Sequence, residues 1–141
     1  MANSRRRLDD SDYCYRRVFP SQIVEDGNTG KRRPSSAALE RRAGEETASM
    51  YARSLLEKHQ ISIDRVLEGH EGMAVVGLAV EAIRRIDFDA VEDPDGVDPD
   101  HPHPCDPAHS GLVEPELSGK PLKRSLSALA KEANVHIDPG A

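Results

Sequence analysis

The sequence predicts a small α+β domain, with a short mixed or antiparallel sheet covered by two or three helices. The length of 141 residues fits one domain. Short β-favouring runs alternate with amphipathic helical segments and show no internal repeat. Ten Pro, ten Gly and the absence of Trp indicate long loops around an aliphatic core. We expect residues 1–11 to form a disordered basic and polar segment and residues 12–138 to form the domain.

The first strand is expected over residues 13–19, an aromatic and β-favouring run that ends at Pro20. Strand alternation places three of its side chains on one face: Tyr13, Tyr15 and Arg17. Residues 22–33 contain Asp-Gly and Thr-Gly pairs, which predict a loop.

Two helices are expected next. Residues 34–42 include Ser35 and Ser36, either of which can cap a short helix. Residues 45–59 have acidic side chains in the first turn and apolar ones near helical spacing: Met50, Leu55 and Leu56, followed by His59.

The main apolar segment, residues 73–86, fits either one helical stripe or a strand followed by a short helix. We favour the strand and helix, because the run Val75-Val76-Gly77-Leu78 is rich in β-favouring residues. Four further elements complete the predicted domain: strands over 88–92 and 110–114, a helix over 120–133 with one apolar face, and residues 135–137, which either add a strand or simply pack.

The formal net charge of −6 is unevenly distributed along the chain. The first 42 residues carry ten Lys/Arg and six Asp/Glu, whereas the remainder carries nine and nineteen. Basic clusters of this kind either meet a phosphate or acidic partner or pair with the acidic half of the same chain. The two cysteines, the lack of an apolar segment after Arg5-Arg6-Arg7 and the lack of a membrane-length apolar run predict a soluble cytoplasmic protein.

Residues 87–109 have the most unusual composition. Residues 87–106 hold eight acidic residues and no Lys or Arg. Four potential metal ligands lie at the end of this stretch: His101, His103, Cys105 and His109. The spacing of Cys105 and His109 suits zinc or another divalent metal, but Pro102 and Pro104 stiffen the segment and no second ligand pair follows. A solvated acidic loop without a cofactor is therefore the preferred interpretation.

A catalytic site would have to be assembled from separate elements, because the sequence lacks the common nucleophile and phosphate-binding motifs. The candidates are His109 as acid or base, Arg16 or Arg17 as an anion clamp and Ser36 as a binding group. Cys105 or Ser110 beside His109 can also be written as a nucleophile–base pair, but adjacency in sequence does not align the side chains.

Three functions follow from these patterns. The first hypothesis is a non-enzymatic accessory module that binds a protein partner through charged surfaces. The second is a small metal-assisted or acid–base hydrolase of a phosphate-bearing or acyl substrate. The third is nucleic-acid binding by the basic N-terminal part, which the negative net charge disfavours. No membrane contact is expected, and the sequence does not define an oligomeric state.

Overall fold

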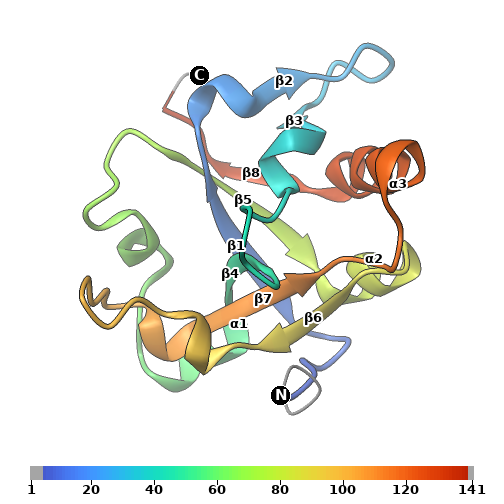
Figure 1. Ribbon diagram of the computed structural model, residues 1–141. Helices are drawn as coiled ribbons and strands as arrows, with labels where there is room; N and C mark the ends of the chain where they lie inside the picture. Colours follow the sequence, from blue (N-terminus) through green and yellow to red (C-terminus); the bar gives the residue numbers. More distant parts are fainter. Residues whose placement is uncertain (1–4, 140–141) are drawn as a thin grey trace.

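Six strands form the central sheet, and every pairing in it is antiparallel. The computed structural model describes residues 5–139. The strand order is β6-β7-β4-β1-β5-β8 (Figure 1). The strands of this sheet are β1 (Tyr13–Val18), β4 (Ala48–Ala52), β5 (Ala74–Ala79), β6 (Asp89–Glu92), β7 (His109–Val113) and β8 (Asn134–Ile137). A separate hairpin pairs β2 (Ile23–Glu25) with β3 (Arg32–Pro34). The predicted α+β class is confirmed.

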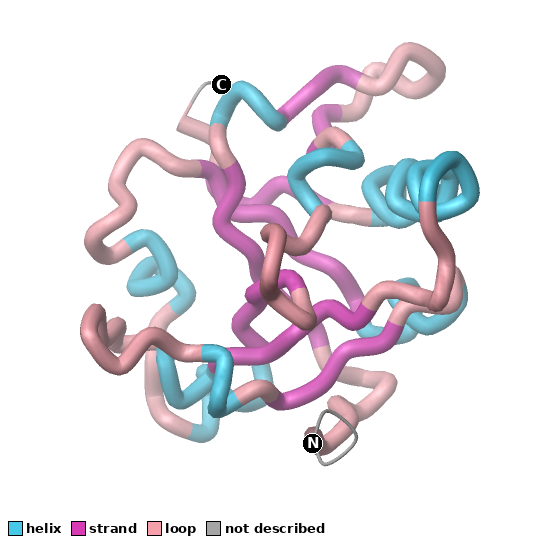
Figure 2. Tube along the Cα trace, in the orientation of Figure 1, coloured by secondary structure: helices cyan, strands magenta, loops and turns pink. Residues whose placement is uncertain are grey.

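The helices are short, apart from one (Figure 2). They are α1 (Arg53–Lys58), α2 (Val80–Arg85) and the longer α3 (Gly119–Glu132). Single 3₁₀ turns connect other parts of the chain: η2 (Pro20–Gln22), η3 (Ser36–Leu39), η4 (Ile63–Leu67), η5 (Pro94–Gly96) and η6 (Asp106–Ala108). Within residues 5–139, no helix has the length and apolar character needed to span a membrane.

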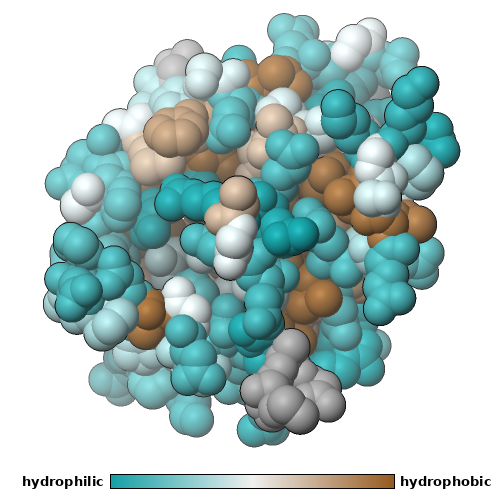
Figure 3. Space-filling view, viewed as in Figure 1, coloured by the Kyte–Doolittle hydropathy of each residue, from teal (hydrophilic) through white to brown (hydrophobic). Residues whose placement is uncertain are grey.

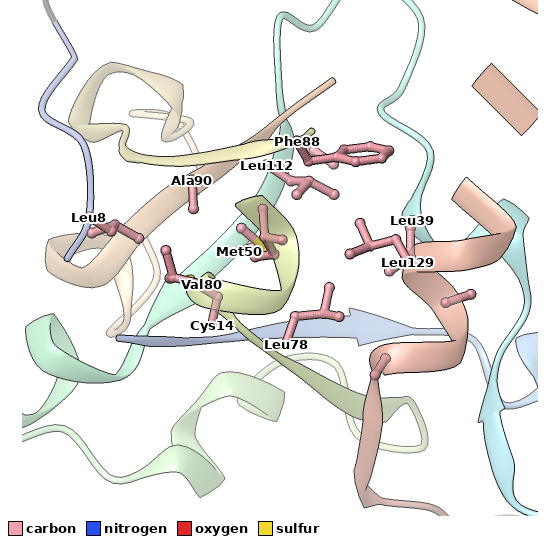
Figure 4. Close-up of a cluster of buried hydrophobic side chains, with 14 of the residues drawn as sticks. Leu8, Cys14, Leu39, Met50, Leu78, Val80, Phe88, Ala90, Leu112 and Leu129 are labelled. Carbon is pink, nitrogen blue, oxygen red and sulfur yellow. The ribbon is translucent and has the colours of Figure 1, made fainter. Parts of the chain in front are cut away.

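The larger hydrophobic cluster lies between one face of the sheet and the helices α2 and α3. Figure 4 shows its side chains pointing toward one another from strands and helices that are distant in sequence. On β4, alternate residues face this cluster, because successive strand side chains point to opposite faces: Ala48, Met50 and Ala52. Leu129 of α3 and Leu39 of η3 are fully buried against them.

A smaller cluster lies on the other face of the sheet, beneath α1, η4 and η6. It contains Tyr15, Tyr51, Leu56, Val66, Val75, Cys105 and Ala108. Cys14 belongs to the larger cluster and Cys105 to the smaller one, and both are buried free thiols. The helix α1 and the turns η4 and η6 cover only part of this face. Polar side chains of the central strands, such as Arg17 and Ser49, therefore remain partly exposed beside them.

The chain before β1 runs beside the edge strand β6. Arg7 forms a β-bridge with Val91, and the Leu8 amide donates to the Ala90 carbonyl at 3.0 Å. The Leu8 side chain is buried. Disorder was expected for residues 1–11; of these, residues 1–4 lie outside the described range, whereas Arg7 and Leu8 are paired and packed.

Many of the basic residues near the N-terminus form ion pairs with acidic residues of the same chain. Basic residues of the first 42 pair with carboxylates from later in the chain: Arg5–Asp93, Arg7–Asp89, Arg32–Asp138 and Arg41–Glu114. Hydrophilic side chains accordingly dominate the face drawn in Figure 3, with hydrophobic ones between them.

Most predicted elements are confirmed, including the strand and helix over residues 73–86 and the helix over 120–133. The helix predicted over residues 45–59 is wrong, because β4 occupies its first half and only α1 is helical. The helix predicted over residues 34–42 shortens to the turn η3, and the loop predicted over 22–33 contains the β2–β3 hairpin. In β4, the two-residue alternation of buried Ala48, Met50 and Ala52 overrides the weaker helical spacing.

Candidate functional site

A cleft opens on the sheet face that carries the smaller cluster. It has two lobes, and both are lined by the same five residues from the strands and loops: Arg17, Arg42, Ser49, Tyr51 and His70. The loop lobe, about 580 Å³, continues toward residues 96–104 and reaches His109. The Phe19 lobe, about 280 Å³, continues toward Phe19 and Met73. The volume of the loop lobe falls within the range of small-molecule sites, and that of the Phe19 lobe lies just below it.

Ser49 and His109 are hydrogen-bonded at the floor of the cleft. The Nδ1 atom of His109 lies 2.7 Å from the carbonyl oxygen of Asp93, which can only accept. Nδ1 of the neutral ring therefore carries the proton, and Nε2 accepts from the Ser49 hydroxyl at 3.1 Å. A serine hydroxyl whose proton is already directed at an oriented imidazole has the geometry of a nucleophile and its general base.

The sheet register and the turn after β6 hold His109 in this orientation. Tyr51 lies directly opposite His109 in the β4–β7 pairing, and its ring contacts the imidazole edge-on at 5.9 Å between centroids. The Asp93 amide donates back to the His109 carbonyl at 3.0 Å. A Cβ atom at Gly96 would lie 2.7 Å from Cε1 of His109, so the absence of a side chain lets η5 pack against the ring.

The Asp93 carboxylate is buried beneath this turn and is fully partnered. Its oxygens accept from Arg5 Nε at 3.0 Å and from the Thr47 hydroxyl at 3.1 Å. One oxygen is 3.9 Å from Nδ1 of His109, close enough to favour an imidazolium that forms during a reaction. The arrangement of Ser49, His109 and Asp93 thus contains the three chemical groups of a hydrolytic triad, with the Asp93 carbonyl as the direct partner of the imidazole.

Arg17 and Tyr51 form one wall of the cleft. The Arg17 guanidinium lies 5.3 Å from the centre of the Tyr51 ring and donates to the Val66 carbonyl at 2.8 Å. Burial raises the pKa of the Tyr51 phenol, and the charge of Arg17 partly offsets this rise. Stacking on an aromatic face and a backbone hydrogen bond fix the guanidinium while leaving further donors available.

Positive charge accumulates at this wall. Burial lowers the pKa of Arg16 to about 10, so it stays charged at neutral pH, and it donates to three carbonyl groups, those of Ala38, Ser49 and Glu40. Partial desolvation lowers the pKa of His70, although its side chain is exposed, and the charges of Arg17 and Arg42 lower it further. The mutual repulsion of these groups would be relieved by an anion.

The carboxylates at the cleft have other roles or lie at its rim. Asp98 pairs with His101, and Asp106 accepts from the amide of His103. Glu45 lines the Phe19 lobe, yet within residues 5–139 no ion pair joins a carboxylate to Arg16, Arg17 or Arg42. The centre of the cleft is therefore cationic.

Three of the four predicted metal ligands line the loop lobe, and each has at least one ring nitrogen that contacts another protein group. His103 donates through Nε2 to the Glu68 carbonyl at 2.9 Å and accepts at Nδ1 from the Cys105 amide at 3.1 Å. His101 is exposed and contacts Asp98. Burial raises the pKa of the Cys105 thiol to about 11. In the part of the chain that the structure describes, no group of three His, Cys, Asp or Glu residues is arranged to hold a metal ion.

Of the predicted catalytic residues, the fold brings His109 and Arg17 to the cleft but places Ser36 elsewhere. Ser36 lies in η3, which packs against α3. Ser110, the serine adjacent to His109, donates to the Ala108 carbonyl and is buried. The serine that does contact His109, Ser49, was missed because residues 45–59 were predicted to be helical. The sequence feature that could have revealed a strand here is the alternation of Ser49 and Tyr51 with the buried residues Ala48, Met50 and Ala52.

Comparisons with protein-family models, with curated proteins and with solved structures find no match to this chain.

Proposed function

We propose that the protein is an acid–base hydrolase of phosphate esters, with Ser49 as nucleophile and His109 as general base. The observation that carries this proposal is the Ser49 Oγ–His109 Nε2 hydrogen bond of 3.1 Å at the floor of a cationic cleft. Arginine side chains are suited to phosphate because their planar donors match its oxygens. In this proposal Arg17 and Arg42 bind the phosphate and stabilise the charge that develops on it.

The reaction proceeds in two displacements. His109 Nε2 accepts the Ser49 hydroxyl proton while Oγ bonds to phosphorus and the P–O ester bond breaks. The resulting imidazolium returns the proton to the departing alkoxide. Water then attacks phosphorus and transfers a proton to His109, the Oγ–P bond breaks, and the serine oxygen recovers that proton. The net reaction converts a phosphate ester and water into an alcohol and a phosphate with one ester bond fewer.

The test compares Ser49→Ala with Ser110→Ala in hydrolysis of p-nitrophenyl phosphate and bis(p-nitrophenyl) phosphate. Removing the nucleophile should lower the rate at least about 10³-fold, as for other serine–histidine pairs. Ser110 is a matched control because it lies on β7 beside His109 but donates only to the Ala108 carbonyl. Circular dichroism of both variants checks that the fold is retained.

Orthovanadate, which mimics pentacoordinate phosphorus, provides a second measurement that does not require the correct leaving group. We expect it to bind wild-type protein and Ser110→Ala but to bind Ser49→Ala more weakly. A folded Ser49→Ala variant with wild-type hydrolysis would contradict the role of Ser49. Wild-type protein that hydrolyses neither ester and binds no vanadate would contradict the proposed function as a whole.

Binding of a protein partner through charged surfaces has less support. That hypothesis rests on unpaired basic clusters, and four of these arginines contact carboxylates of the same chain. Among the described arginines of these clusters, Arg16, Arg17 and Arg42 form no ion pair with a carboxylate, and all three line the cleft. Their placement favours a small anionic ligand over an extended protein surface.

A further inference from the structure

We propose that the substrate is a phosphate ester of a nucleotide, and that the nucleotide base stacks on Phe19. This inference rests on the proposed function and assigns the substrate class of the same cleft. Phe19 is 56% exposed, and among the described residues the only other exposed large hydrophobic side chain is that of Leu117. Phe19 lines a cleft lobe with Arg17, Arg42 and His70. An exposed ring beside phosphate-binding cations is the combination that recognises nucleotides.

The local backbone holds Phe19 in place. Pro20 follows it and restricts its backbone to the extended region, where its φ is −71° and its ψ is 144°. The Phe19 amide donates to Oε1 of Gln22 at 3.0 Å, and the Gln22 amide donates back to the Phe19 carbonyl at 2.8 Å. The ring is therefore presented from a fixed turn at the end of β1, which lowers the entropic cost of stacking on it.

The order of groups along the cleft matches the order of groups in a nucleotide ester. Phe19 and Met73 line only the Phe19 lobe, whereas His109 lines only the loop lobe. Arg17 and Ser49 lie in the part that both lobes share. In a diester of a nucleotide, a base at Phe19 thus places the phosphate beside Arg17 and Ser49, and the second alcohol, which departs, extends past His109 toward residues 96–104.

The size of the Phe19 lobe favours a single nucleotide over a nucleic-acid strand. Its volume of about 280 Å³ suits one base with part of its sugar rather than a run of stacked bases. Phe19 and Tyr51 are the only Phe, Tyr or Trp side chains among the described residues that line this lobe, and the Tyr51 ring is covered by Arg17. Strand-binding surfaces instead provide successive aromatic side chains for successive bases.

The experiment measures binding of AMP, ribose 5-phosphate and inorganic phosphate by calorimetry. We expect AMP to bind at least about ten-fold more tightly than ribose 5-phosphate, as one stacked base would provide. Phe19→Ala should remove this difference and leave phosphate affinity unchanged, whereas Phe19→Trp should retain it. Leu117→Ala is the control for loss of an exposed apolar side chain away from the Phe19 lobe.

Equal affinities for AMP and ribose 5-phosphate, with phosphate still bound, would overturn the nucleoside assignment and leave the proposed phosphate site standing. AMP binding that survives Phe19→Ala would also overturn it. Failure of all three probes to bind would reject both proposals. Tighter binding of a short oligoadenylate than of AMP would replace the single nucleotide with a nucleic-acid strand.

Discussion

His70 is the residue whose ionisation reports most directly on the charge of the cleft. Its ring is near His103, with centroids 5.9 Å apart, and its pKa lies below the usual 6.5 because of partial desolvation and the neighbouring arginines. The folded state therefore resists protonation of His70 more than the unfolded chain does. Its effect on stability is absent well above pH 6.5 and becomes unfavourable as the pH falls below that value.

Sulfate should reverse this effect, because a dianion between Arg17, Arg42 and His70 favours the protonated ring. We predict that the His70 resonance titrates at higher pH with sulfate present and that sulfate binds more tightly as the pH falls from about 7 to about 5.5. NMR titration of the histidine ring protons measures both. Sulfate is suitable because its own charge is constant over this range.

His136 provides the control for the sulfate titration. Burial and Arg53 lower its pKa too, but it contacts Tyr13 and does not line the cleft. Its titration should be insensitive to sulfate. A similar shift at both histidines would indicate a general salt effect and would count against a specific anion site at Arg17 and Arg42.

The segment before β1 links the edge of the sheet to the site. Arg5 Nε donates to Asp93, whose carboxylate is only 4% exposed and whose carbonyl orients His109. Removing the guanidinium leaves a buried carboxylate with Thr47 as its remaining side-chain hydrogen-bond donor. The segment is thus a structural part of the turn that positions the imidazole.

We predict that Arg5→Gln lowers the free energy of unfolding by roughly 1–3 kcal/mol, because a buried charge loses its partner. Urea unfolding measures the loss. Arg6→Gln is the matched control: the Arg6 side chain is 84% exposed and lies 3.7 Å from Glu92, so its removal should change stability by less than about 0.5 kcal/mol. Equal effects of the two substitutions would show that the Arg5–Asp93 contact contributes nothing specific.

The sequence predicted elements well where one periodicity dominates. The apolar face of α3 repeats over fourteen residues. The β-favouring run of β5 distinguishes this strand from the helix α2 that follows it directly. The prediction from sequence was wrong at β4. This five-residue strand directly precedes the short helix α1, and the apolar residues of the two elements together resemble one longer helix. That error also concealed the site, because only a strand places Ser49 and Tyr51 on the face shared with Arg17.

His109 and Arg17 could be proposed from residue type, whereas their neighbours depend on pairings between distant strands. Ser49 and His109 are separated by sixty positions and meet only through the β4–β7 register. Periodicity within one segment carries no information about which strand pairs with which. The position of Ser36 away from the cleft follows from the same limit, because the packing of η3 against α3 is a tertiary contact.

Two of the three hydrophobic clusters in the described part of the molecule lie on opposite faces of the central sheet. Leu129 is buried in the larger cluster and Val66 in the smaller one, with neither side chain exposed. Because β1 and β4 contribute side chains to both clusters, loss of either cluster exposes strands that the other requires. The two faces should therefore unfold together.

We predict that Leu129→Ala destabilises the protein by about 2–5 kcal/mol and Val66→Ala by a smaller amount, since fewer methyl groups are lost. Their effects should add to within about 0.5 kcal/mol in the double variant, because the sheet separates the two sites. Tyrosine fluorescence and far-ultraviolet circular dichroism should report one coincident urea transition. Two resolved transitions would contradict a shared cooperative unit.

The two free cysteines turn this layered arrangement into a pair of natural chemical probes. Cys14 is enclosed on the α3 side of the sheet and Cys105 on the cleft side, and burial raises the pKa of both thiols. Neither reacts readily with an alkylating reagent until the structure around it opens, since the thiolate is the reactive form. Mass-resolved alkylation of the unmodified chain can therefore report the exposure of each face separately: equal labelling rates indicate global unfolding, whereas faster labelling of one cysteine indicates local opening on its own face.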